Sequence, residues 1–464
     1  MEYYGDDSPI AALATGVGEN ALAVIRTSGK NCLQLLASVF SNPQKLLAAP
    51  GHSVVLGWIL SSHKPAERID QVLVSVFRAP KSFTGEDCAD VSCHGGSATT
   101  TGVLSSLRAA GFRDSLRGEF AFRAFMNGKI DLTRAESIME IVSSRTEKSL
   151  QNAVKRLSGA LEREIRAIKE RLVEALAAVE IFLDYSEDEV SNDEDEKSGA
   201  LPKKPLISDC LQRLQELSAS FRVERLYQDG ASVVIAGRPN VGKSSLFNRL
   251  LKQDRSIVTD APGATRDYIE ASIAVQGVPI RLVDTAGLRE TEDAVERIGV
   301  EYARNLAKSA DALLYIVDGE AGLTAEDEGF LDGVSRERVI DPGKVIIVFN
   351  KADLVSERDA GRLFVSAKTG QGLDDLAQAV VQFLRVSGDE SATLVGVASA
   401  RQKDLVDRAV DCLSSALVLS EKKEPLDVIA PLVRTAVDAL GEITGQVSTA
   451  DILETMFSKF CVGK

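Results

Sequence analysis

The chain has 464 residues and a formal net charge of −14, with 44% hydrophobic and 26% charged residues. This length exceeds what one hydrophobic core supports and predicts two to four domains. The negative charge disfavours indiscriminate nucleic-acid binding, which needs Lys and Arg on phosphates, and favours small ligands or protein partners. No run approaches the roughly 18 apolar residues of a membrane span, and the acidic start lacks the basic residues of a signal peptide. The six cysteines form no CxxC pair, so we expect a reduced, cytoplasmic protein.

The first half of the chain divides into two regions of different pattern. Residues 1–125 alternate short β-like runs with glycine-rich turns, and Val72–Phe77 is the clearest strand. The pattern predicts long helices from about residue 131 to residue 226. The prediction is clearest over Ala160–Leu183, where apolar residues recur at helical spacing. We interpret the acidic run within this helical region, residues 186–196, as a solvated loop.

The second half contains a region of alternating strands and helices, residues 231–385, followed by a return of the helical pattern. Continuous apolar strands separated by helices are typical of a parallel sheet covered on both faces. We expect the two helical stretches to form one domain into which the alternating region is inserted. The strand candidates are Ser232–Ala236, Ile280–Val283, Ala312–Val317 and Val345–Phe349.

A phosphate-binding loop follows the first of these strands. Gly237–Ser244 fits the pattern G-x-x-x-x-G-K-[ST] and precedes a helical run, which is the context that the motif requires. Its glycines let backbone N–H groups surround phosphate oxygens, and the helix N-terminus favours negative charge. We expect Lys243 to reach the β- and γ-phosphates and the Ser244 hydroxyl to hold Mg²⁺.

Three further motifs follow in the order expected of a GTP-binding protein. Asp284–Gly287 supplies an acidic residue near Mg²⁺ and a glycine for the γ-phosphate. Asp353, in Asn350–Asp353, can accept two hydrogen bonds from guanine that adenine does not offer, and Ser366–Lys368 completes the base pocket. The predicted GTP-binding residues are Asn240, Val241, Gly242, Lys243, Ser244, Ser245, Thr259, Asp260, Ala261, Pro262, Gly263, Ala264, Thr265, Asp284, Thr285, Ala286, Gly287, Asn350, Lys351, Asp353, Ser366, Ala367 and Lys368.

We predict that two segments between these motifs are nucleotide-dependent switches. Thr265 is the natural second hydroxyl on Mg²⁺, in a segment expected to order around the γ-phosphate. Leu288 occupies the position at which Ras-like proteins carry the Gln that orients the attacking water, so another polar group must do this. The nearby candidates, among which the pattern does not choose, are Arg289, Glu290, Glu292, Asp293, Glu296 and Arg297.

Outside the alternating region 231–385, short segments spread over the chain carry a resemblance. They are Val24–Gly29, Pro80–Asp87, Cys93–Gly96, Gly118–Phe120 with Arg123–Leu132, and the terminal Cys461–Lys464. Together they resemble the MnmE (TrmE) family of tRNA-modifying GTPases over essentially the whole length. A C-x-G-K terminus beside a G domain is highly specific for that family.

The resemblance implies an α/β multidomain fold. An N-terminal α/β domain (1–125) would bind tetrahydrofolate and form a homodimer, and a helical domain would combine residues 126–230 and 386–464. A P-loop G domain with a mostly parallel, doubly wound sheet (231–385) would be inserted between them. Together with a flavoprotein partner, MnmG (GidA), in a heterotetramer, the family modifies C5 of the wobble uridine of certain tRNAs. The added group is aminomethyl or carboxymethylaminomethyl, with a carbon from 5-formyl- or methylene-tetrahydrofolate.

The resemblance also assigns folate contacts to four residues. Arg26, Glu86, Lys129 and Lys464 match family folate contacts. Arg and Lys can pair with the glutamate carboxylate of folate, and Glu86 can accept hydrogen bonds from pterin N–H groups. The sequence does not decide whether the Cys461 thiol is structural or catalytic.

For hydrolysis, the resemblance implies Glu296 as the residue that orients water, with Lys243 as the other catalytic residue. K⁺ would replace an arginine finger, with Asn240, Thr259, Ala261 and Ala264 at its site, and the two G domains of a dimer would meet across their GTP faces. The family usually has Thr at the position of Ala264, so potassium affinity depends on whether that position acts through its backbone carbonyl.

Two other functions fit part of the pattern. A ribosome-assembly switch with an Era-like or Der-like G domain leaves the N-terminal 230 residues and the C-terminal tail without a role, and the chain lacks a second G domain and the GxxG of a KH domain. A GTP-regulated folate enzyme would involve no RNA. The sequence does not show a tRNA surface. Several Lys and Arg residues put positive charge on the helices, but interspersed Glu residues favour a solvated helix face. These residues are Arg145, Lys148, Lys155, Arg156, Arg163, Arg166, Lys169 and Arg171.

Overall fold

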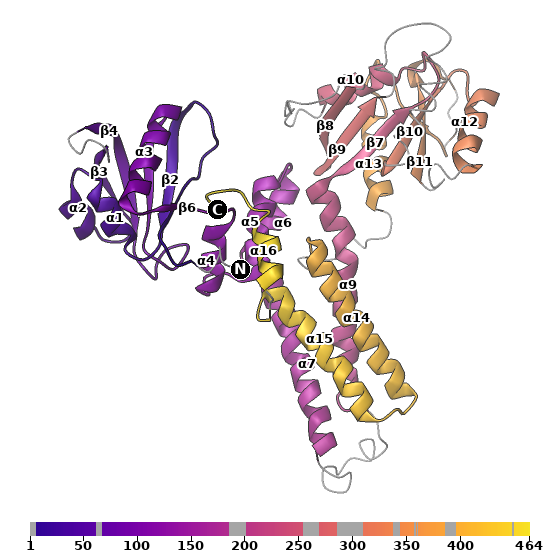
Figure 1. The fold of residues 1–464 in the computed structure, drawn as a ribbon. Coiled ribbons are helices and arrows are strands. Elements are labelled where there is room, and N and C mark those ends of the chain that lie inside the picture. Colours follow the sequence, from indigo (N-terminus) through magenta and orange to yellow (C-terminus); the bar gives the residue numbers. More distant parts are fainter. Residues whose placement is uncertain are drawn as a thin grey trace. The chain divides into compact units, whose positions relative to one another are not determined.

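In the computed structural model the chain forms two compact units (Figure 1). The first combines Met1–Met139 with Val437–Lys464, and the second is Glu140–Ala436. Within the described residues, none of the helices has the length and hydropathy of a membrane-spanning segment. The described residues are 6–61, 67–184, 201–253, 269–284, 310–336, 344–356, 359, 361–385, 396–447 and 450–464.

The first unit is built on a six-stranded sheet with the order β3-β4-β5-β2-β1-β6. Neighbouring strands are antiparallel, except that β1 and β6 are parallel. The strands are β1 (Ile10–Leu13), β2 (Asn20–Ser28), β3 (Ser53–Leu60), β4 (Arg68–Phe77), β5 (Cys88–Gly95) and β6 (Arg113–Asp114). The helices within this unit are α1 (Cys32–Ser38), α2 (Pro43–Ala48), α3 (Ser97–Ala110), α4 (Glu119–Met126) and α16 (Ala450–Phe457).

Helices α1 and α3 cover one face of this sheet. Val74 and Val91 from the strands are buried in one core with Leu33 of α1 and Leu107 of α3. The sequence pattern predicted the strand at Val72–Phe77, which β4 confirms, but it missed α3. That helix begins with Ser-Ala-Thr-Thr-Thr-Gly, which are mostly poor helix formers, so it is stabilised by burial against the sheet rather than by local propensity.

In the second unit, the long helix α9 packs against α7 and α14. Helix α7 confirms the helix predicted over Ala160–Leu183. Ser399 and Gln402 form a capping box at the start of α14, which satisfies backbone N–H groups there. The helices of this region are α6 (Glu147–Leu157), α7 (Ala160–Asp184), α9 (Lys204–Asp229) and α14 (Ala400–Glu421), while α5 (Leu132–Ser143) and α15 (Leu426–Thr444) cross the boundary between the units.

A second six-stranded sheet, with the order β12-β11-β10-β7-β9-β8, lies in the same unit. Its strands are parallel except for β8, which is antiparallel to β9, so the mostly parallel sheet predicted from the sequence is confirmed. The strands are β7 (Ala231–Ala236), β8 (Ile269–Val275), β9 (Val278–Asp284), β10 (Ala312–Asp318), β11 (Val345–Asn350) and β12 (Leu363–Phe364). The helices are α10 (Lys243–Gln253), α12 (Ala325–Arg336), α13 (Leu373–Arg385) and the 3-10 turn η4 (Ala352–Leu354).

Helices cover both faces of this sheet (Figure 1). Residues of β7 alternate between the faces: Val233 packs in the core formed with α10 and α13, and Val234 packs in the core that Phe330 of α12 adjoins. This alternation explains the continuous apolar strands, because both sides of each strand are buried. Because the helices cover the two faces, a ligand of such a sheet binds at the loops that follow the carboxyl ends of the strands.

Candidate functional site

The phosphate-binding loop joins β7 to α10 and has an unusual backbone. Gly237, Asn240 and Gly242 have φ values of 144°, 63° and 94°. A Cβ atom on Gly237 would lie 2.3 Å from the carbonyl oxygen of Ile316, and one on Gly242 would lie 2.3 Å from the amide nitrogen of Asn350. The loop therefore needs glycine at both positions, for backbone freedom and for space.

Lys243 and Ser244 lie at the start of α10, and Lys243 points back into this loop. The Lys243 Nζ donates hydrogen bonds to the carbonyl oxygens of Gly237 and Arg238, at 2.9 and 2.8 Å. Burial lowers the pKa of Lys243, and the nearby Asp284 carboxylate opposes this effect. Ser244 Oγ donates to Asp284 Oδ2 at 3.0 Å. A hydroxyl beside a carboxylate fits the oxygen ligands that Mg²⁺ prefers, so these two residues suit the predicted magnesium position.

Asn350 links the predicted base pocket to the phosphate loop. Its Nδ2 donates to the carbonyl oxygen of Val241 at 2.8 Å, and its Oδ1 accepts from the backbone N–H of Ala367 at 3.1 Å. Ser366 Oγ donates to Asp353 Oδ1 at 2.6 Å, and this hydrogen bond lowers the pKa of Asp353. The Asp353 carboxylate is thereby held ionised, as an acceptor for guanine N–H groups must be.

Lys351 is held by Asp318, a residue that the sequence motifs did not predict. Its φ of 63° is left-handed, and its Nζ donates to Asp318 Oδ2 at 2.5 Å. Burial alone would raise the pKa of Asp318, but the hydrogen bond and charge of Lys351 and the backbone hydrogen bonds from Glu320 and Ala321 together lower it. Asp318 ends β10, and only the pairing of β10 with β11 reveals that it faces Lys351. Of the other predicted residues, Ser245 lies in the first turn of α10, and Lys368 is exposed beside the pocket.

The two switch segments lie outside the described residues. The same is true of Leu288 and of the alternative water-orienting groups in residues 289–297. The structure therefore brings together the phosphate loop, Asp284 and the base motifs, and the remaining site predictions stay predictions. The predicted site residues concerned are Thr259, Asp260, Ala261, Pro262, Gly263, Ala264, Thr265, Thr285, Ala286, Gly287 and Glu296.

In the first unit, the chain's C-terminal tail lies against β2. Arg26 donates from Nη1 to the carbonyl oxygen of Gly463 at 3.2 Å and pairs through Nε with Asp90 at 3.2 Å. Burial lowers the pKa of Lys464, and the positive charge of Arg26 adds to this effect, while Cys461 opposes it. Two of the four predicted folate contacts, Arg26 and Lys464, are thus neighbours although they lie at opposite ends of the chain.

Glu86, a third predicted folate contact, is bound by protein groups. Its Oε2 accepts from Ser28 Oγ at 2.7 Å and from Arg123 Nη1 at 3.1 Å, and Arg123 also pairs with the buried Glu119 at 3.0 Å. Arg123 begins the family-like segment Arg123–Leu132, but the sequence did not show that it is the partner of Glu86. The fourth residue, Lys129, donates to the carbonyl oxygen of Pro80 at 2.8 Å.

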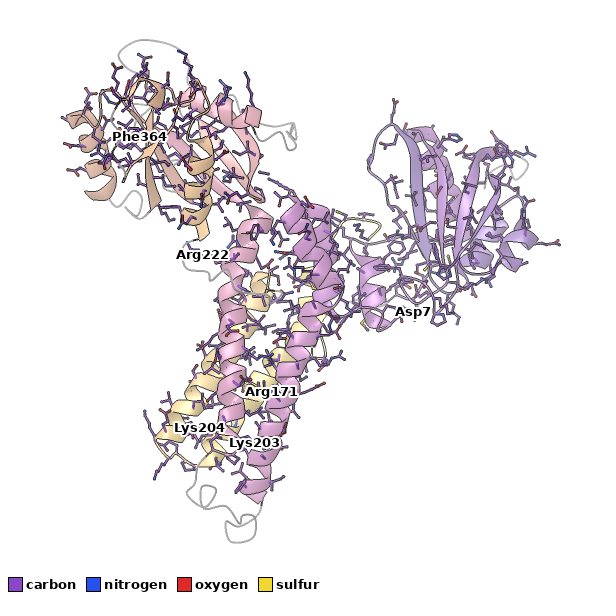
Figure 2. All side chains as sticks on the ribbon, turned by 180° about the vertical axis from the view of Figure 1, so that it is seen from behind. Asp7, Arg171, Lys203, Lys204, Arg222 and Phe364 are labelled. Carbon is purple, nitrogen blue, oxygen red and sulfur yellow. The ribbon has the colours of Figure 1, made fainter. Side chains whose placement is uncertain are left out.

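Several basic residues of the long helices are paired with carboxylates. Arg166 pairs with Glu162 on the same helix, and Arg171 of α7, labelled in Figure 2, pairs with Asp209 of α9. Arg156 is buried and pairs with Glu140 and Glu224, so it belongs to the helical core and not to a surface. The exposed pairs of Arg166 and Arg171 favour the solvated helix face predicted from the sequence.

Family models match almost the whole chain. A model described as the N-terminus of the GTP-binding protein TrmE matches residues 9–129, and one described as the MnmE helical domain matches residues 132–461. The chain belongs to the MnmE (TrmE) family of GTPases. This membership confirms the predicted resemblance and the predicted fold class.

Relatives within the MnmE family align over nearly their full length. A protein named tRNA modification GTPase MnmE from Treponema denticola is 40% identical over 481 residues, covering 99% of each chain. One of the same name from Alkaliphilus metalliredigens is 36% identical over 470 residues, again covering 99% of each. Among solved structures, Aquifex aeolicus Era is 23% identical and covers 39% of this chain and 66% of its own, with a TM-score of 0.27, which is too low to establish a relationship.

Proposed function

We propose that this protein hydrolyses GTP in the modification of certain tRNAs at C5 of the wobble uridine, together with a flavoprotein of the MnmG (GidA) kind. The observation that carries the proposal is the contact between Arg26 and the C-terminal tail at Gly463. It places the family's terminal C-x-G-K motif beside a predicted folate contact. A ribosome-assembly switch would give neither the tail nor the N-terminal sheet a role.

The GTPase part of the proposal rests on the phosphate loop and the base motifs. Lys243 would contact the β- and γ-phosphates and offset the charge that develops on them during hydrolysis. Ser244 and Thr265 would hold Mg²⁺ in place, and Asp353 would select guanine. Glu296 would orient the attacking water, because Leu288 has no group that can.

We infer a potassium site at the first half of the loop. Asn240 is exposed and left-handed, with a side-chain oxygen available for a monovalent cation near the phosphates. Thr259, Ala261 and Ala264 would contribute the remaining oxygens, so that K⁺ supplies the positive charge that an arginine finger supplies elsewhere. Pairing of two G domains would order that segment and complete the site.

The folate part of the proposal rests on the charges around Arg26. Arg26 and Lys464 form a positive pair suited to the glutamate carboxylate of 5-formyl- or methylene-tetrahydrofolate. Glu86 keeps acceptor capacity for pterin N–H groups, since a carboxylate offers about four lone-pair positions and Arg123 and Ser28 use only some. The folate, when bound, would supply the one-carbon unit.

A homodimer through the N-terminal sheet is supported by an exposed apolar face. Leu56 and Leu73 are paired across β3 and β4 and are 50% and 48% exposed, and Leu22 on β2 is 63% exposed. Helices α1 and α3 cover only the opposite face. Clustered exposed apolar residues of this kind mark protein interfaces.

We also propose the domain boundaries expected from the sequence, with a heterotetramer formed by two copies of this chain and two of the flavoprotein. The domains would be 1–125, 126–230 together with 386–464, and the inserted 231–385. A cytoplasmic location is supported by the six cysteines, all of which are free thiols that a reducing compartment maintains.

Mass spectrometry of tRNA nucleosides tests the proposal. A deletion strain should lack the modified wobble uridine, and the wild-type gene should restore it. A Lys243→Ala variant should not restore it, whereas a matched exposed change on the same helix, Lys252→Ala, should. Normal wobble nucleosides in the deletion strain, with a ribosome-assembly defect, would favour the Era-like alternative instead.

A further inference from the structure

One side chain of the phosphate loop is held by a buried carboxylate that no motif includes. Arg238 Nε donates to Asp327 Oδ1 at 3.0 Å, and Tyr315 Oη donates to the same oxygen at 2.9 Å. Asp327 is fully buried, and Arg238 is about a quarter exposed. Asp327 belongs to α12, on the opposite face of the sheet from α10, so the contact joins the loop to a different layer of the domain.

The two oxygens of Asp327 have different partners. Oδ2 accepts from the backbone N–H and the hydroxyl of Thr324, at 3.0 and 2.8 Å, and so caps the start of α12. Oδ1 receives the long-range donors, Arg238 and Tyr315. Burial alone would raise the pKa of Asp327, but the hydrogen bonds from Thr324 and Tyr315 and the charge of Arg238 outweigh it and lower the pKa. The carboxylate is therefore a fixed, ionised anchor.

Tyr315 orients this anchor from the sheet itself. It pairs with Ala236, the last residue of β7 before the phosphate loop. Its ring stacks on Phe330 of α12, with centroids 5.0 Å apart and planes at 19°. The anchor is thus tied both to the strand that leads into the loop and to the helix that carries Asp327.

The rest of the loop is held differently. Asn350 fixes its second half through the carbonyl of Val241, and Ser244 bonds Asp284. Neither contact reaches the first half, where Asn240 has a left-handed backbone, which is stable only if surrounding contacts hold it. The Arg238 carbonyl also accepts from Lys243, so movement of Arg238 would displace the ammonium as well.

We propose that Arg238 and Asp327 are positioning residues for GTP hydrolysis: the pair holds the first half of the phosphate loop, and with it Asn240 and Lys243, in the geometry that the γ-phosphate needs. The inference rests on the proposed GTPase function. Because the guanidinium is bound to Asp327, Arg238 does not act as an arginine finger in this state. Loss of the pair should weaken contacts to the γ-phosphate of GTP more than it weakens the binding of GDP. The contacts of GDP lie mainly in the half of the loop that Asn350 holds.

The test compares two adjacent carboxylates in the full-length protein. Asp327→Asn and Arg238→Met should each lower kcat about tenfold or more while changing the GDP dissociation constant by less than about threefold. Combining them should be little worse than either alone, because they remove one interaction. The matched control is Glu326→Gln: Glu326 is 79% exposed, lies 3.6 Å from Arg238 Nη1, and should have little effect. Arg238→Lys should recover part of the activity.

Binding measurements separate this inference from the proposed function. The ratio of affinities for a non-hydrolysable GTP analogue and for GDP should fall in Arg238→Met, and this ratio is measurable even if the wild type does not turn over GTP. Absent turnover in the wild type would count against the proposed function alone. The positioning role is overturned if Arg238→Met leaves both kcat and the affinity ratio unchanged, or if the Asp327 and Arg238 effects add independently. Activity losses that only follow a lowered Tm, with equal loss of GDP affinity, would overturn it too.

Discussion

The side-chain amide of Asn350 donates a hydrogen bond to the carbonyl oxygen of Val241 across 2.8 Å. Asn350 ends β11, and Val241 lies in the loop after β7, so the contact passes over the end of β10. One residue of the base-recognition motif therefore supports the phosphate loop. Substitutions of Asn350 would disturb both ends of the predicted nucleotide site, so separate tests of base selection and hydrolysis require other residues.

Base selection is tested at Asp353. Asp353→Asn should lower GTP affinity well over tenfold and favour xanthosine nucleotides, whose 2-oxo group accepts from an amide donor. Competition of GTP, XTP and ATP against a labelled guanine nucleotide measures the change. Asp359→Asn, an exposed carboxylate paired with Arg362 nearby, is the control and should bind like the wild type. Wild-type GTP affinity in Asp353→Asn would refute the base-pocket assignment.

Water orientation is tested at Glu296. A group that positions water acts mainly in the transition state, so Glu296→Ala should bind GTP normally and hydrolyse it on the order of a hundredfold more slowly. Single-turnover hydrolysis and equilibrium binding measure the two effects. Unchanged turnover would move the role to another candidate, and Glu290→Ala, Glu292→Ala and Asp293→Ala are the variants to compare.

Potassium dependence is tested at Asn240. Wild-type turnover should be at least about tenfold faster in K⁺ than in Na⁺, because a cation near the phosphates offsets developing charge. Asn240→Gly should lose this difference and still bind nucleotide, since glycine adopts the φ of 63° without strain and only the side-chain oxygen is removed. The titration should extend well above physiological K⁺ because Ala264 replaces the usual Thr. Equal rates in both salts, without association of the G domains, would exclude the potassium mechanism.

The folate contacts are tested at the tail. Arg26→Met, and separately deletion of residues 461–464, should weaken binding of 5-formyl-tetrahydrofolate in calorimetry and reduce tRNA modification, because each removes a positive partner of the folate carboxylate. GTP turnover should remain largely intact. Lys459→Met, an exposed change just before the tail, is the control. Parallel loss of folate binding and GTP turnover in both variants would indicate misfolding instead of a folate site.

The dependence of GTP affinity on pH is tested at Lys243. Burial lowers the pKa of Lys243 in the free protein below its ordinary value of 10.5, and bound phosphates should raise it again. Affinity should be constant at pH values where free Lys243 is charged. It should fall as pH rises through the lowered pKa, because binding then requires proton uptake. In Lys243→Arg the guanidinium stays charged, so this variant should bind GTP more weakly, but its GTP affinity should decline less steeply with rising pH. Equal slopes of affinity against pH in the variant and the wild type would contradict the role of Lys243.

Much of the nucleotide site could be predicted from the sequence because its chemistry is local. The glycines at 237 and 242 are required by the backbone of the loop, and Asp353 follows a buried strand in a fixed motif. These structural requirements allow only a few residue types at fixed spacing, so the motif can be identified from the sequence without knowledge of the fold. Helix α3 could not be predicted in this way, because its sequence favours helix weakly and only the sheet beneath it stabilises the helix.

The sequence by itself determined the family and the phosphate-loop motif and predicted the choice of guanine, because these depend on residues within one turn or strand. Only the tertiary structure decided which charged side chains pair with groups far away in the chain. Arg26 meets Gly463, and Arg238 meets Asp327, across 437 and 89 positions of the chain. Such pairs depend on strand order and helix packing, which bring distant segments within hydrogen-bond distance, and no local spacing encodes them.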